Sequence, residues 1–600
     1  MSMPTPRFAP LFAVALAVAG FAAASGGALA QEQQSAAQQT ADEQLRALYE
    51  ADWAWSLREY EQQDDGEGGL EPTGRLPRVD AESQRRRLAH ARETLAALDR
   101  IPADALSDAE RVNAAVFRTN LEHALIDGRF RDWEMPVNSD SAFWQYLAPR
   151  QGYRTADEYR RYISRMRDIP RYFDENIANM REGLARGFTP PRATLQGRDS
   201  AIAAFAVADV EQNPFFAPLN DMPPGIPAEQ REELRREARA AITDAVVPAF
   251  DELLRFFRDE YVPNTRTSLA ASRLPDGRAY YAAQIRKYTT LELSAEEIHQ
   301  IGLREVARIE AEMLQVMRDS GFEGSLDEFL TFLRTDPQFY ARSPEELLMV
   351  SAYAVNRVNA KIGDVIGHLP RRRFTVLPVP DAIAPYYTAG RGGLESCLMN
   401  TYDLPSRPLY NIPALTLHEC SPGHSLQAAL SEEGQALPAF RRNTYFSGFG
   451  EGWGLYSEWL GVEMGIYRTP YEQFGRLSYE MWRAARLVID TGIHRYGWSR
   501  ERAIEYLASH TALSRREVET EVDRYISWPG QALAYKLGEL TIRRLRTEAE
   551  TALGERFDRR RFHDAILALG STPLPVLEER IARFIEEESA RTAPQQQAAE

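Results

Sequence analysis

The chain has 600 residues, a formal net charge of −16 and a hydrophobic content of 44%. The acidic balance argues against nucleic-acid binding, which usually needs a basic surface, and the hydrophobic content is ordinary for a globular protein. No internal apolar stretch is long enough to cross a bilayer, so the composition agrees with a large soluble enzyme.

The N-terminus is predicted to be a signal peptide over residues 1–30. Arg7 precedes an apolar run from Leu11 to Ala24, and the small residues Ala28 to Ala30 offer a cleavage site. No cysteine stands at that cleavage point, so we expect an exported protein, periplasmic or secreted, without a lipid anchor. Residues 31–42 are rich in Gln, Ala and Ser, which predicts a flexible start to the mature chain.

The chain after residue 42 predicts a mainly α fold. Ser or Thr followed three residues later by Glu is a typical N-cap pattern, and it heads amphipathic runs at Ser107/Glu110, Thr155/Glu158, Ser294/Glu297, Ser343/Glu346 and Ser514/Glu517. Long helical patterns cover about 227–260, 294–319 and 344–367. Breaks near 212–226 and 263–278 are interpreted as loops. We therefore expect residues 43–370 and 371–600 to form one continuous body, the first part making the wall opposite the second.

The exception to the helical pattern is the segment from about 373 to 404. Phe374 to Val379 is β-branched and interrupted by proline, which suits a short edge strand. Three glycines between 390 and 393 mark a turn, and Ser396 to Tyr402 predicts a second strand that leads to the next helix. We expect this small edge β-sheet to hold a substrate backbone by β-augmentation, with Asn400 and Tyr402 as candidate substrate-binding residues.

The segment Leu415-Thr-Leu-His418-Glu419-Cys-Ser-Pro-Gly-His424 is the strongest functional signal in the chain. Neutral imidazoles are good zinc ligands, and a carboxylate beside one of them can act as general base on a water molecule. His418 and His424 are six residues apart, however, and on a straight helix that spacing turns them to different faces. Pro422 and Gly423 can break the helix between them, which would let both rings meet one metal ion. The alternative is a helical segment whose histidines have separate partners.

Two glutamates follow in the segment Glu451-Gly-Trp-Gly-Leu-Tyr-Ser-Glu458. They are seven residues apart, so they share a helical face, and Trp453, Tyr456 and Trp459 surround them. A carboxylate that is surrounded by apolar side chains should be paired or metal-bound. We predict that Glu451 is the third zinc ligand and that Glu458 orients a histidine from behind; the alternative is a solvated helix face.

Cys397 and Cys420 are the only cysteines. They could form a disulfide in an oxidising compartment, which would pin the metal motif to the strand before it. Because nothing in the sequence shows that the two are close, we favour two buried free thiols. A role for Cys420 as zinc ligand or nucleophile is the least favoured alternative.

Further candidate residues begin at Asp490. Asp490 and His494 are one helical turn apart and could hydrogen-bond. His494 is an oxyanion donor, an alternative metal ligand, or a histidine that caps its own helix. Tyr525 and Tyr535 flank a Trp-Pro-Gly-Gln break, where a phenol can donate to an oxyanion. Arg524 could pair with a substrate carboxylate or with Glu521. The candidates for capture of a charged peptide terminus are Arg391, Arg524 and Lys536.

Together these motifs resemble the large bacterial family known as domain of unknown function 885. The resemblance rests on the two motifs above and on Asp490-Thr-Gly-Ile-His494, Arg524-Tyr525, Pro529-Gly-Gln531, Tyr535-Lys-x-Gly538 and Phe562-His563-Asp564. It covers most of the mature chain. The family is similar to the helical zinc peptidases of the thimet-oligopeptidase and angiotensin-converting-enzyme type, which implies a large helical zincin-like body with a central cleft and one Zn²⁺ per chain.

The predicted activity is hydrolysis of peptide bonds in short peptides. In this mechanism His418, His424 and Glu451 hold zinc, Glu419 moves the proton from the zinc-activated water to the leaving amine, and Tyr535, with His494 or Tyr525, stabilises the oxyanion. Zn²⁺ is favoured over Mg²⁺ because imidazole suits it. Two alternatives stay open: a non-catalytic periplasmic binding protein on a degenerate peptidase scaffold, which the longer gap between the histidines would explain, and a metal-dependent hydrolase of other esters or amides.

Overall fold

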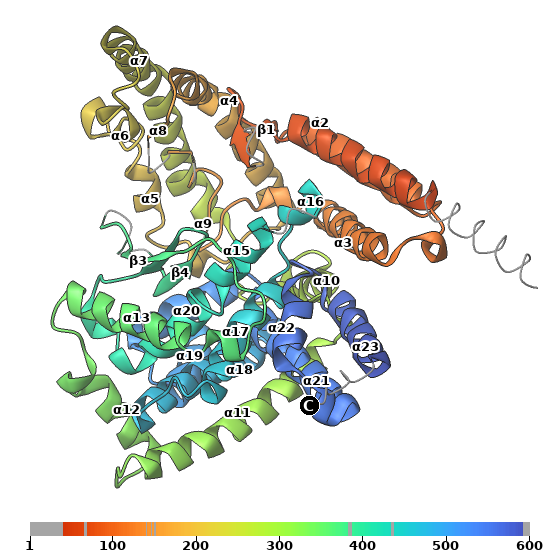
Figure 1. Cartoon of the computed structure of the whole chain (residues 1–600). Coiled ribbons are helices and arrows are strands. Elements are labelled where there is room, and N and C mark those ends of the chain that lie inside the picture. Colours follow the sequence, from red (N-terminus) through yellow and green to blue (C-terminus); the bar gives the residue numbers. More distant parts are fainter. Residues whose placement is uncertain are drawn as a thin grey trace, which may run out of the picture.

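The computed structural model is mainly helical, with two small sheets (Figure 1). It describes residues 40–64, 69–139, 141–145, 147–148, 152–381, 384, 387–433 and 437–591. The predicted signal peptide and residues 31–39 lie outside the described residues. Residues 40–42 were expected to be flexible, but they begin a helix over 40–59 in which Ala41 and Asp42 are buried. The expectation is wrong there because Asp42 is tied to the body, where its carboxylate accepts from the backbone N–H of Ser107 at 2.9 Å.

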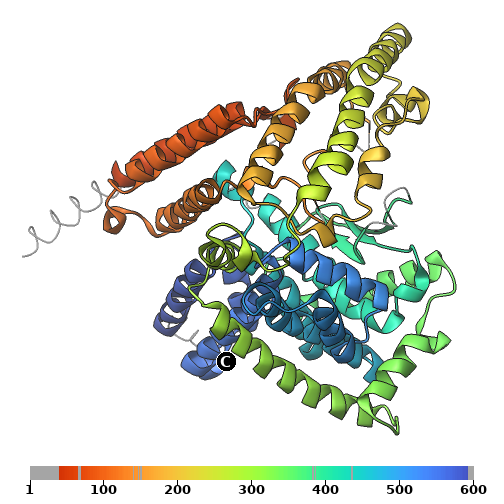
Figure 2. The same cartoon turned by 180° about the vertical axis from the view of Figure 1, so that it is seen from behind.

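The N-terminal helices form the upper part of the molecule in both views (Figures 1 and 2). They are α2 (Ala81–Leu98), α3 (Asp108–Phe130), α4 (Ala156–Arg186), α5 (Asp199–Ala203), α6 (Ala217–Asn220), α7 (Ala228–Ala241), α8 (Val247–Arg255) and α9 (Val262–Asn264). Two π-helical turns, Ile242–Val246 and Phe256–Tyr261, join α7, α8 and α9 into one helix, which confirms the helical pattern predicted from about 227 to 260. The aromatic side chains of Phe173, Phe215 and Phe250 close the core between α4 and α8.

The next four helices pack against the C-terminal half of the chain. They are α10 (Gly277–Thr289), α11 (Ala295–Asp319), α12 (Leu326–Thr335) and α13 (Pro344–Asn359). Gly302 lets α11 lie so close to α18 (Pro470–His494) that a Cβ atom there would stand 2.8 Å from Leu487. Residues 43–370 therefore do not form a single opposite wall, because α10 to α13 belong with the C-terminal helices. The pattern predicted from 344 to 367 ends as a helix at Asn359.

The five predicted N-caps are confirmed. Each Ser or Thr side chain accepts from the backbone N–H of the Glu three residues on: Ser107, Thr155, Ser294, Ser343 and Ser514. Such a cap satisfies one of the free N–H groups of the first turn and is worth about 1 kcal/mol.

A three-stranded sheet lies between the upper helices and the C-terminal helices (Figure 1). Its strands are β3 (Thr375–Pro378), β4 (Gly390–Gly392) and β5 (Ser396–Met399), in the order β3-β5-β4, with β3 parallel and β4 antiparallel to β5. The predicted edge strand and second strand are confirmed as β3 and β5. The glycines at 390 and 392 were predicted to mark a turn, but they form β4. A separate hairpin pairs β1 (Gln62–Asp64) with β2 (Leu70–Pro72).

The C-terminal helices make up the rest of the body. They are α14 (Ile412–Glu419), α15 (His424–Glu433), α16 (Ala439–Arg442), α17 (Ser447–Glu463), α18 (Pro470–His494), α19 (Arg500–His510), α20 (Arg515–Ser527), α21 (Ala534–Leu553), α22 (Arg559–Leu567) and α23 (Leu574–Ala590). None of the described helices combines the length and apolar character needed to cross a membrane.

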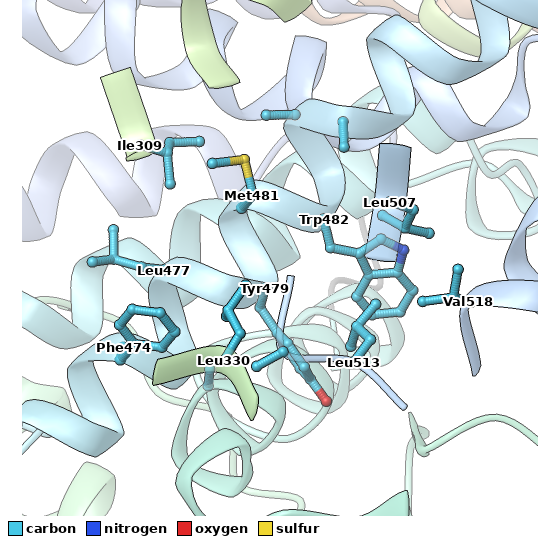
Figure 3. Close-up of a cluster of buried hydrophobic side chains, with 14 of the residues drawn as sticks. Ile309, Leu330, Phe474, Leu477, Tyr479, Met481, Trp482, Leu507, Leu513 and Val518 are labelled. Atoms are coloured by element: carbon cyan, nitrogen blue, oxygen red, sulfur yellow. The ribbon is translucent and has the colours of Figure 1, made fainter. Parts of the chain in front are cut away.

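Helix α18 is the centre of this body, and it is buried on every side from Phe474 to His494. Figure 3 shows its apolar side chains meeting residues of α11, α12, α19 and α20. Burial of each large apolar side chain contributes about 1.5–3 kcal/mol. The charged side chains of α18 are paired, as burial requires: the guanidinium groups of Arg476, Arg483 and Arg486 meet carboxylates of Glu480, Glu458 and Glu521 at 2.6, 3.2 and 2.9 Å.

Candidate metal centre

The helix carrying the first histidine breaks where the sequence predicts a break. Helix α14 ends at Glu419 and α15 begins at His424, with Cys420 outside the helical region at φ −94° and ψ −92°. Gly423 is required because a Cβ atom there would lie 1.8 Å from the carbonyl oxygen of His418. The break brings the two imidazole rings to a centroid distance of 4.9 Å. The six-residue spacing therefore does not separate the histidines.

Three side-chain atoms converge at this point: Nε2 of His418, Nε2 of His424 and Oε2 of Glu451 from α17. They all lie within 4.8 Å of one another, and Glu451 Oε2 is 3.4 Å from each histidine nitrogen. A direct N–H···O hydrogen bond is shorter, about 2.7–3.2 Å. Ligands held about 2.0–2.2 Å from one tetrahedral zinc ion stand about 3.4 Å apart. The donor set and its spacing therefore fit a zinc ion.

The Nδ1 atom of each histidine, which is not the atom that faces Glu451, has a hydrogen-bond partner of its own. Nδ1 of His418 lies 2.8 Å from Glu458 Oε1, and since an ionised carboxylate only accepts, Nδ1 carries the proton and Nε2 presents its lone pair. Nδ1 of His424 lies 3.3 Å from Gln427 Oε1, which favours the same tautomer. Glu458 also meets Arg483 of α18 at 3.2 Å, so this buried carboxylate has a cationic partner.

The electrostatics of the three ligands favour a cation. Burial lowers the pKa of His418, but the carboxylates of Glu451 and Glu458 outweigh burial and raise the pKa to about 9. Burial also lowers the pKa of His424, but the Glu451 carboxylate outweighs burial, so that the pKa of His424 is raised. For Glu451, burial favours the neutral acid, yet the two histidines hold its pKa well below the ordinary value. The carboxylates thus hold positive charge at this point, whether it comes from protons or from a metal ion.

Glycines in α17 create the space for this arrangement. A Cβ atom on Gly454 would stand 2.7–3.0 Å from three atoms of the His418 ring. Two residues earlier, Gly452 faces Gly538 of α21, where a Cβ atom on Gly538 would lie 2.0 Å from the carbonyl oxygen of Gly448 and 2.7 Å from the Cα of Gly452. Backbone-to-backbone contact of the two helices therefore sets the distance between Glu451 on α17 and Tyr535 on α21.

The predicted general base, Glu419, is anchored by the sheet. Its Oε2 accepts from the backbone N–H of Gly392 in β4 at 2.8 Å. A Cβ atom on Gly392 would lie 1.8 Å from the carbonyl oxygen of Glu419, so only glycine lets β4 approach this closely. The strand that was predicted to be a turn thus holds the carboxylate beside the three ligand atoms.

The two cysteines form a disulfide, with their Cα atoms 5.4 Å apart. The favoured interpretation of two free thiols is wrong. Cys397 in β5 lies opposite Gly392 in β4, and Cys420 lies in the turn between α14 and α15. The bond ties the metal motif to the middle strand of the sheet, and it leaves no free Cys420 sulfur for a metal ion or a substrate.

Tyr535 lies beside the ligand set. Its ring centroid is 6.3 Å from that of His418, and the two rings are inclined by 22°. The guanidinium of Arg486 lies 4.3 Å from the centroid of the Tyr535 ring. Arg524 Nη2 donates to the Tyr535 hydroxyl at 3.3 Å and to Gln531 Oε1 at 3.0 Å. Arg524 also pairs with Glu521 at 3.6 Å, as one of its two predicted roles required.

The structure does not bring His494, Tyr525 or Asp490 to the ligand set with a free functional atom. Nδ1 of His494 accepts from the N–H of Ala271 at 3.0 Å and Nε2 lies 2.8 Å from the carbonyl oxygen of Tyr525, so both ring nitrogens are used by backbone. The Tyr525 hydroxyl accepts from Trp482 and Arg486 in the buried interior.

The expected hydrogen bond between Asp490 and His494 is also replaced. Asp490 accepts from the hydroxyl of Tyr281 at 2.6 Å and from the N–H of Gly530 at 3.1 Å. Burial raises the pKa of Asp490 to about 7, against the effect of these donors. The one-turn spacing gave a wrong prediction because α18 is surrounded by other segments. Asp490 and His494 therefore meet partners from those segments.

The four other predicted residues either have structural partners or lie at exposed positions. The Asn400 amide donates to the carbonyl oxygens of Ala384, Tyr387 and Thr388 and accepts from the N–H of Tyr402, so it organises its own loop. Tyr402 is half-exposed. Lys536 is 0% exposed and pairs with Glu305, Glu480 and Glu539, which removes it as a group that captures a peptide terminus. Arg391 lies in β4 with its side chain exposed.

Two residues at the centre were missed in the sequence. Tyr445, six residues before Glu451, donates its hydroxyl to Glu451 Oε1 at 3.2 Å, and Arg483 pairs with Glu458. Neither belongs to a motif with a fixed ligand spacing. The available signal for Tyr445 was its position, since it is an aromatic residue shortly before the Glu451 segment.

Comparison with known proteins gives a family and related structures. The model of a family described as "Bacterial protein of unknown function (DUF885)" matches residues 62–581. A solved structure of a "putative lipoprotein" from Colwellia psychrerythraea is 28% identical, with 92% of this chain and 99% of that chain covered and a TM-score of 0.80. A "putative lipoprotein of unknown function" from Shewanella oneidensis is 17% identical, with 90% and 99% covered and a TM-score of 0.62, and this likeness shows the fold alone. No curated protein matches the chain.

Proposed function

The chain belongs to the DUF885 family of bacterial proteins of unknown function, and from that premise we propose that it is an exported zinc-dependent hydrolase, a metallopeptidase that cleaves short peptides. One observation carries the proposal: two histidines and a glutamate converge within 4.8 Å of one another, beside a carboxylate that can accept a proton. Two histidines, one glutamate and an open position are a known catalytic zinc arrangement.

The ligand residues would be His418, His424 and Glu451. A zinc ion bound there would polarise a substrate carbonyl and lower the pKa of a water molecule. Glu458 and Gln427 would hold the histidines in the tautomer that presents Nε2, and Arg483 pairs with Glu458.

Glu419 would act as the general base and then as the general acid. Its Oε2 accepts from Gly392, which fixes the carboxylate and leaves Oε1 to take the proton of the attacking water. The same carboxyl group then gives that proton to the leaving amine, so that one residue completes the proton transfer.

Tyr535 would donate a hydrogen bond to the developing oxyanion. Its oxygen accepts from Arg524, so its own O–H would be left to donate to the substrate oxyanion. The positive charge of Arg524 on that oxygen makes the phenol a better donor. His494 and Tyr525, whose polar atoms serve the interior, are not part of this mechanism.

The edge strand beside the site supports the proposal of a peptide substrate. A strand next to the catalytic carboxylate can pair with an extended peptide, and β4 is an edge strand whose Gly392 N–H points to Glu419 rather than to β5. We extend the resemblance to helical zinc peptidases to this chain, including the central cleft. Export is proposed from the leader-like residues 1–30 and from the relatives described as lipoproteins.

Metal content and peptide cleavage on the purified mature protein test the proposal. Elemental analysis should find about one zinc per chain, lost in His424→Ala and retained in the surface control His368→Ala. Glu419→Gln should keep the zinc and lose cleavage of a peptide library, since it removes the base and no ligand.

Wild-type protein that takes up no zinc at neutral pH would sink the hydrolase mechanism. Zinc bound by wild type and Glu419→Gln alike, with no cleavage of any peptide, ester or amide by either, would instead support the non-catalytic binding protein.

A further inference from the structure

Tyr445 is an exposed aromatic side chain that touches Glu451, one of the three proposed ligand residues. It lies in the link between α16 and α17, six residues before Glu451, and its hydroxyl donates to Glu451 Oε1 at 3.2 Å. The side chain is 58% exposed, so this hydrogen bond stands at the solvent side of the site. Burial in the core therefore does not explain why the phenol is there.

The two oxygens of Glu451 have different partners. Oε2 is the atom that lies 3.4 Å from Nε2 of both histidines, while Oε1 receives the phenol proton of Tyr445. A carboxylate can bind a metal ion through one oxygen or through both. A donor on Oε1 disfavours the two-oxygen mode because the phenol and the metal ion would then compete for the electron density of the same oxygen.

The Tyr445 ring lies on a glycine, and the residues on both sides of Tyr445 are held by hydrogen bonds. A Cβ atom on Gly450 would stand 2.4–2.6 Å from atoms at the outer end of the ring, so the ring lies directly on this glycine. On one side of Tyr445, the Thr444 hydroxyl accepts from Asn120 of α3 at 2.8 Å. On the other, the N–H of Phe446 donates to Ser571 at 2.8 Å.

We propose that Tyr445 is a positioning residue that restricts Glu451 to one metal-binding oxygen and so keeps a coordination position open for water and substrate. This inference rests on the proposed function. It differs from the role of Tyr535, whose phenol proton is directed to the substrate, because the Tyr445 proton is engaged by the ligand itself.

Cobalt substitution provides a test that does not depend on activity. Co²⁺ reports its coordination number through its visible absorption, which weakens as ligands are added. In Tyr445→Phe we expect weaker absorption per bound cobalt than in wild type, because Glu451 then binds through both oxygens. Metal affinity should stay equal or increase, whereas kcat on any peptide that wild type cleaves should fall about 10–100-fold with little change in KM.

Two further variants separate this role from a general effect on folding. Gly450→Ala retains the phenol but pushes the ring away, so it should reproduce the cobalt spectrum of Tyr445→Phe. Tyr496→Phe is the matched control, because Tyr496 is also exposed and donates to a glutamate, Glu296, far from the ligand set. Its spectrum, metal affinity and kcat should equal those of wild type.

The outcomes distinguish the inference from the proposed function. A Tyr445→Phe spectrum identical to wild type, or a loss of metal affinity in parallel with kcat, overturns the positioning role while the metal centre stands. Wild-type protein that binds neither Co²⁺ nor Zn²⁺ overturns the proposed function and this inference with it.

Discussion

The tautomer of His418 is the most consequential property of a single side chain in this protein. Three groups determine it: Glu458 behind Nδ1, Arg483 beside Glu458, and Gly454, which leaves room for the ring. The first is visible in the sequence as a glutamate seven residues after Glu451. The other two come from the fold, since Arg483 belongs to α18 and Gly454 matters only through its contact with α14.

Gly454→Ala should therefore damage the metal centre without changing any ligand. The added methyl group would stand 2.7–3.0 Å from the His418 ring, and this ring cannot move because it is buried and paired. We expect a zinc affinity at least about tenfold weaker and a destabilisation of roughly 1–3 kcal/mol from overpacking. Chelator competition and thermal unfolding measure the two effects.

The control is Gly363→Ala, whose Cβ atom would meet nothing within 4 Å. It should bind zinc as wild type does. Equal zinc affinities for Gly454→Ala and Gly363→Ala would contradict the assigned fit.

Two buried histidines should make the stability fall in mild acid. Burial lowers the pKa of His494 and of His563 to about 3, from an ordinary value of 6.5. Below pH 6.5 the unfolded chain takes up protons that the folded chain refuses. The stability is thus complete above pH 6.5 and is lost toward pH 3, by about 1.4 kcal/mol per pH unit for each histidine.

His563→Gln isolates this effect from loss of metal in acid. Nδ1 of His563 lies 2.7 Å from the carbonyl oxygen of Val365, and Nε2 lies 2.8 Å from the Tyr456 hydroxyl, and a glutamine amide can offer both a donor and an acceptor. The decrease in unfolding temperature from pH 7 to pH 5 should be smaller in the variant. The same decrease in both proteins would show that His563 does not contribute.

Contact between helices explains why some predictions from local patterns held and others did not. The N-caps and the Pro422-Gly423 break depend on neighbours in the chain, and the structure confirms them. Strand β4 was missed because glycines signal a turn locally, whereas here Gly392 is needed for close approach to Glu419. His494 was assigned to the site because its partners, Ala271 and the backbone of Tyr525, cannot be identified from spacing along α18.

Gly538→Ala should force α17 and α21 apart. The new Cβ atom would lie 2.0 Å from the Gly448 carbonyl oxygen and 2.7 Å from the Gly452 Cα, and backbone atoms cannot rotate out of the way. We expect roughly 1–3 kcal/mol of destabilisation and a lower kcat, because Tyr535 moves relative to Glu451. Gly225→Ala, which meets nothing within 4 Å, should leave the unfolding temperature and kcat as they are in wild type.

Across the molecule, the ligand residues come from one short stretch while their support comes from distant parts of the chain. His418, His424 and Glu451 lie on α14, α15 and α17, but α18, α21 and the sheet hold those helices in place. The sequence could therefore predict from local motifs that these three side chains come together. It could not predict the packing of α11 along α18, which moves α10 to α13 away from the wall expected for residues 43–370.

Removal of the metal should lower the stability of the body as a whole. A ligand at 100 times its dissociation constant stabilises the folded state by about 2.7 kcal/mol. A chelator should therefore lower the unfolding temperature of the wild-type protein, and added zinc should restore it. His424→Ala should show neither change; a chelator effect of equal size in that variant would indicate a metal site elsewhere.

The Cys397–Cys420 bond makes completion of the metal centre depend on where the chain folds. Cys420 lies between the proposed base and the second histidine, and Cys397 lies opposite the glycine whose N–H holds that base. In a reducing cytosol, packing alone would have to hold this turn, whereas an oxidising compartment adds the covalent bond. For an exported peptidase, maturation would then coincide with departure from the cytosol, and newly made cytosolic polypeptides would be spared its activity.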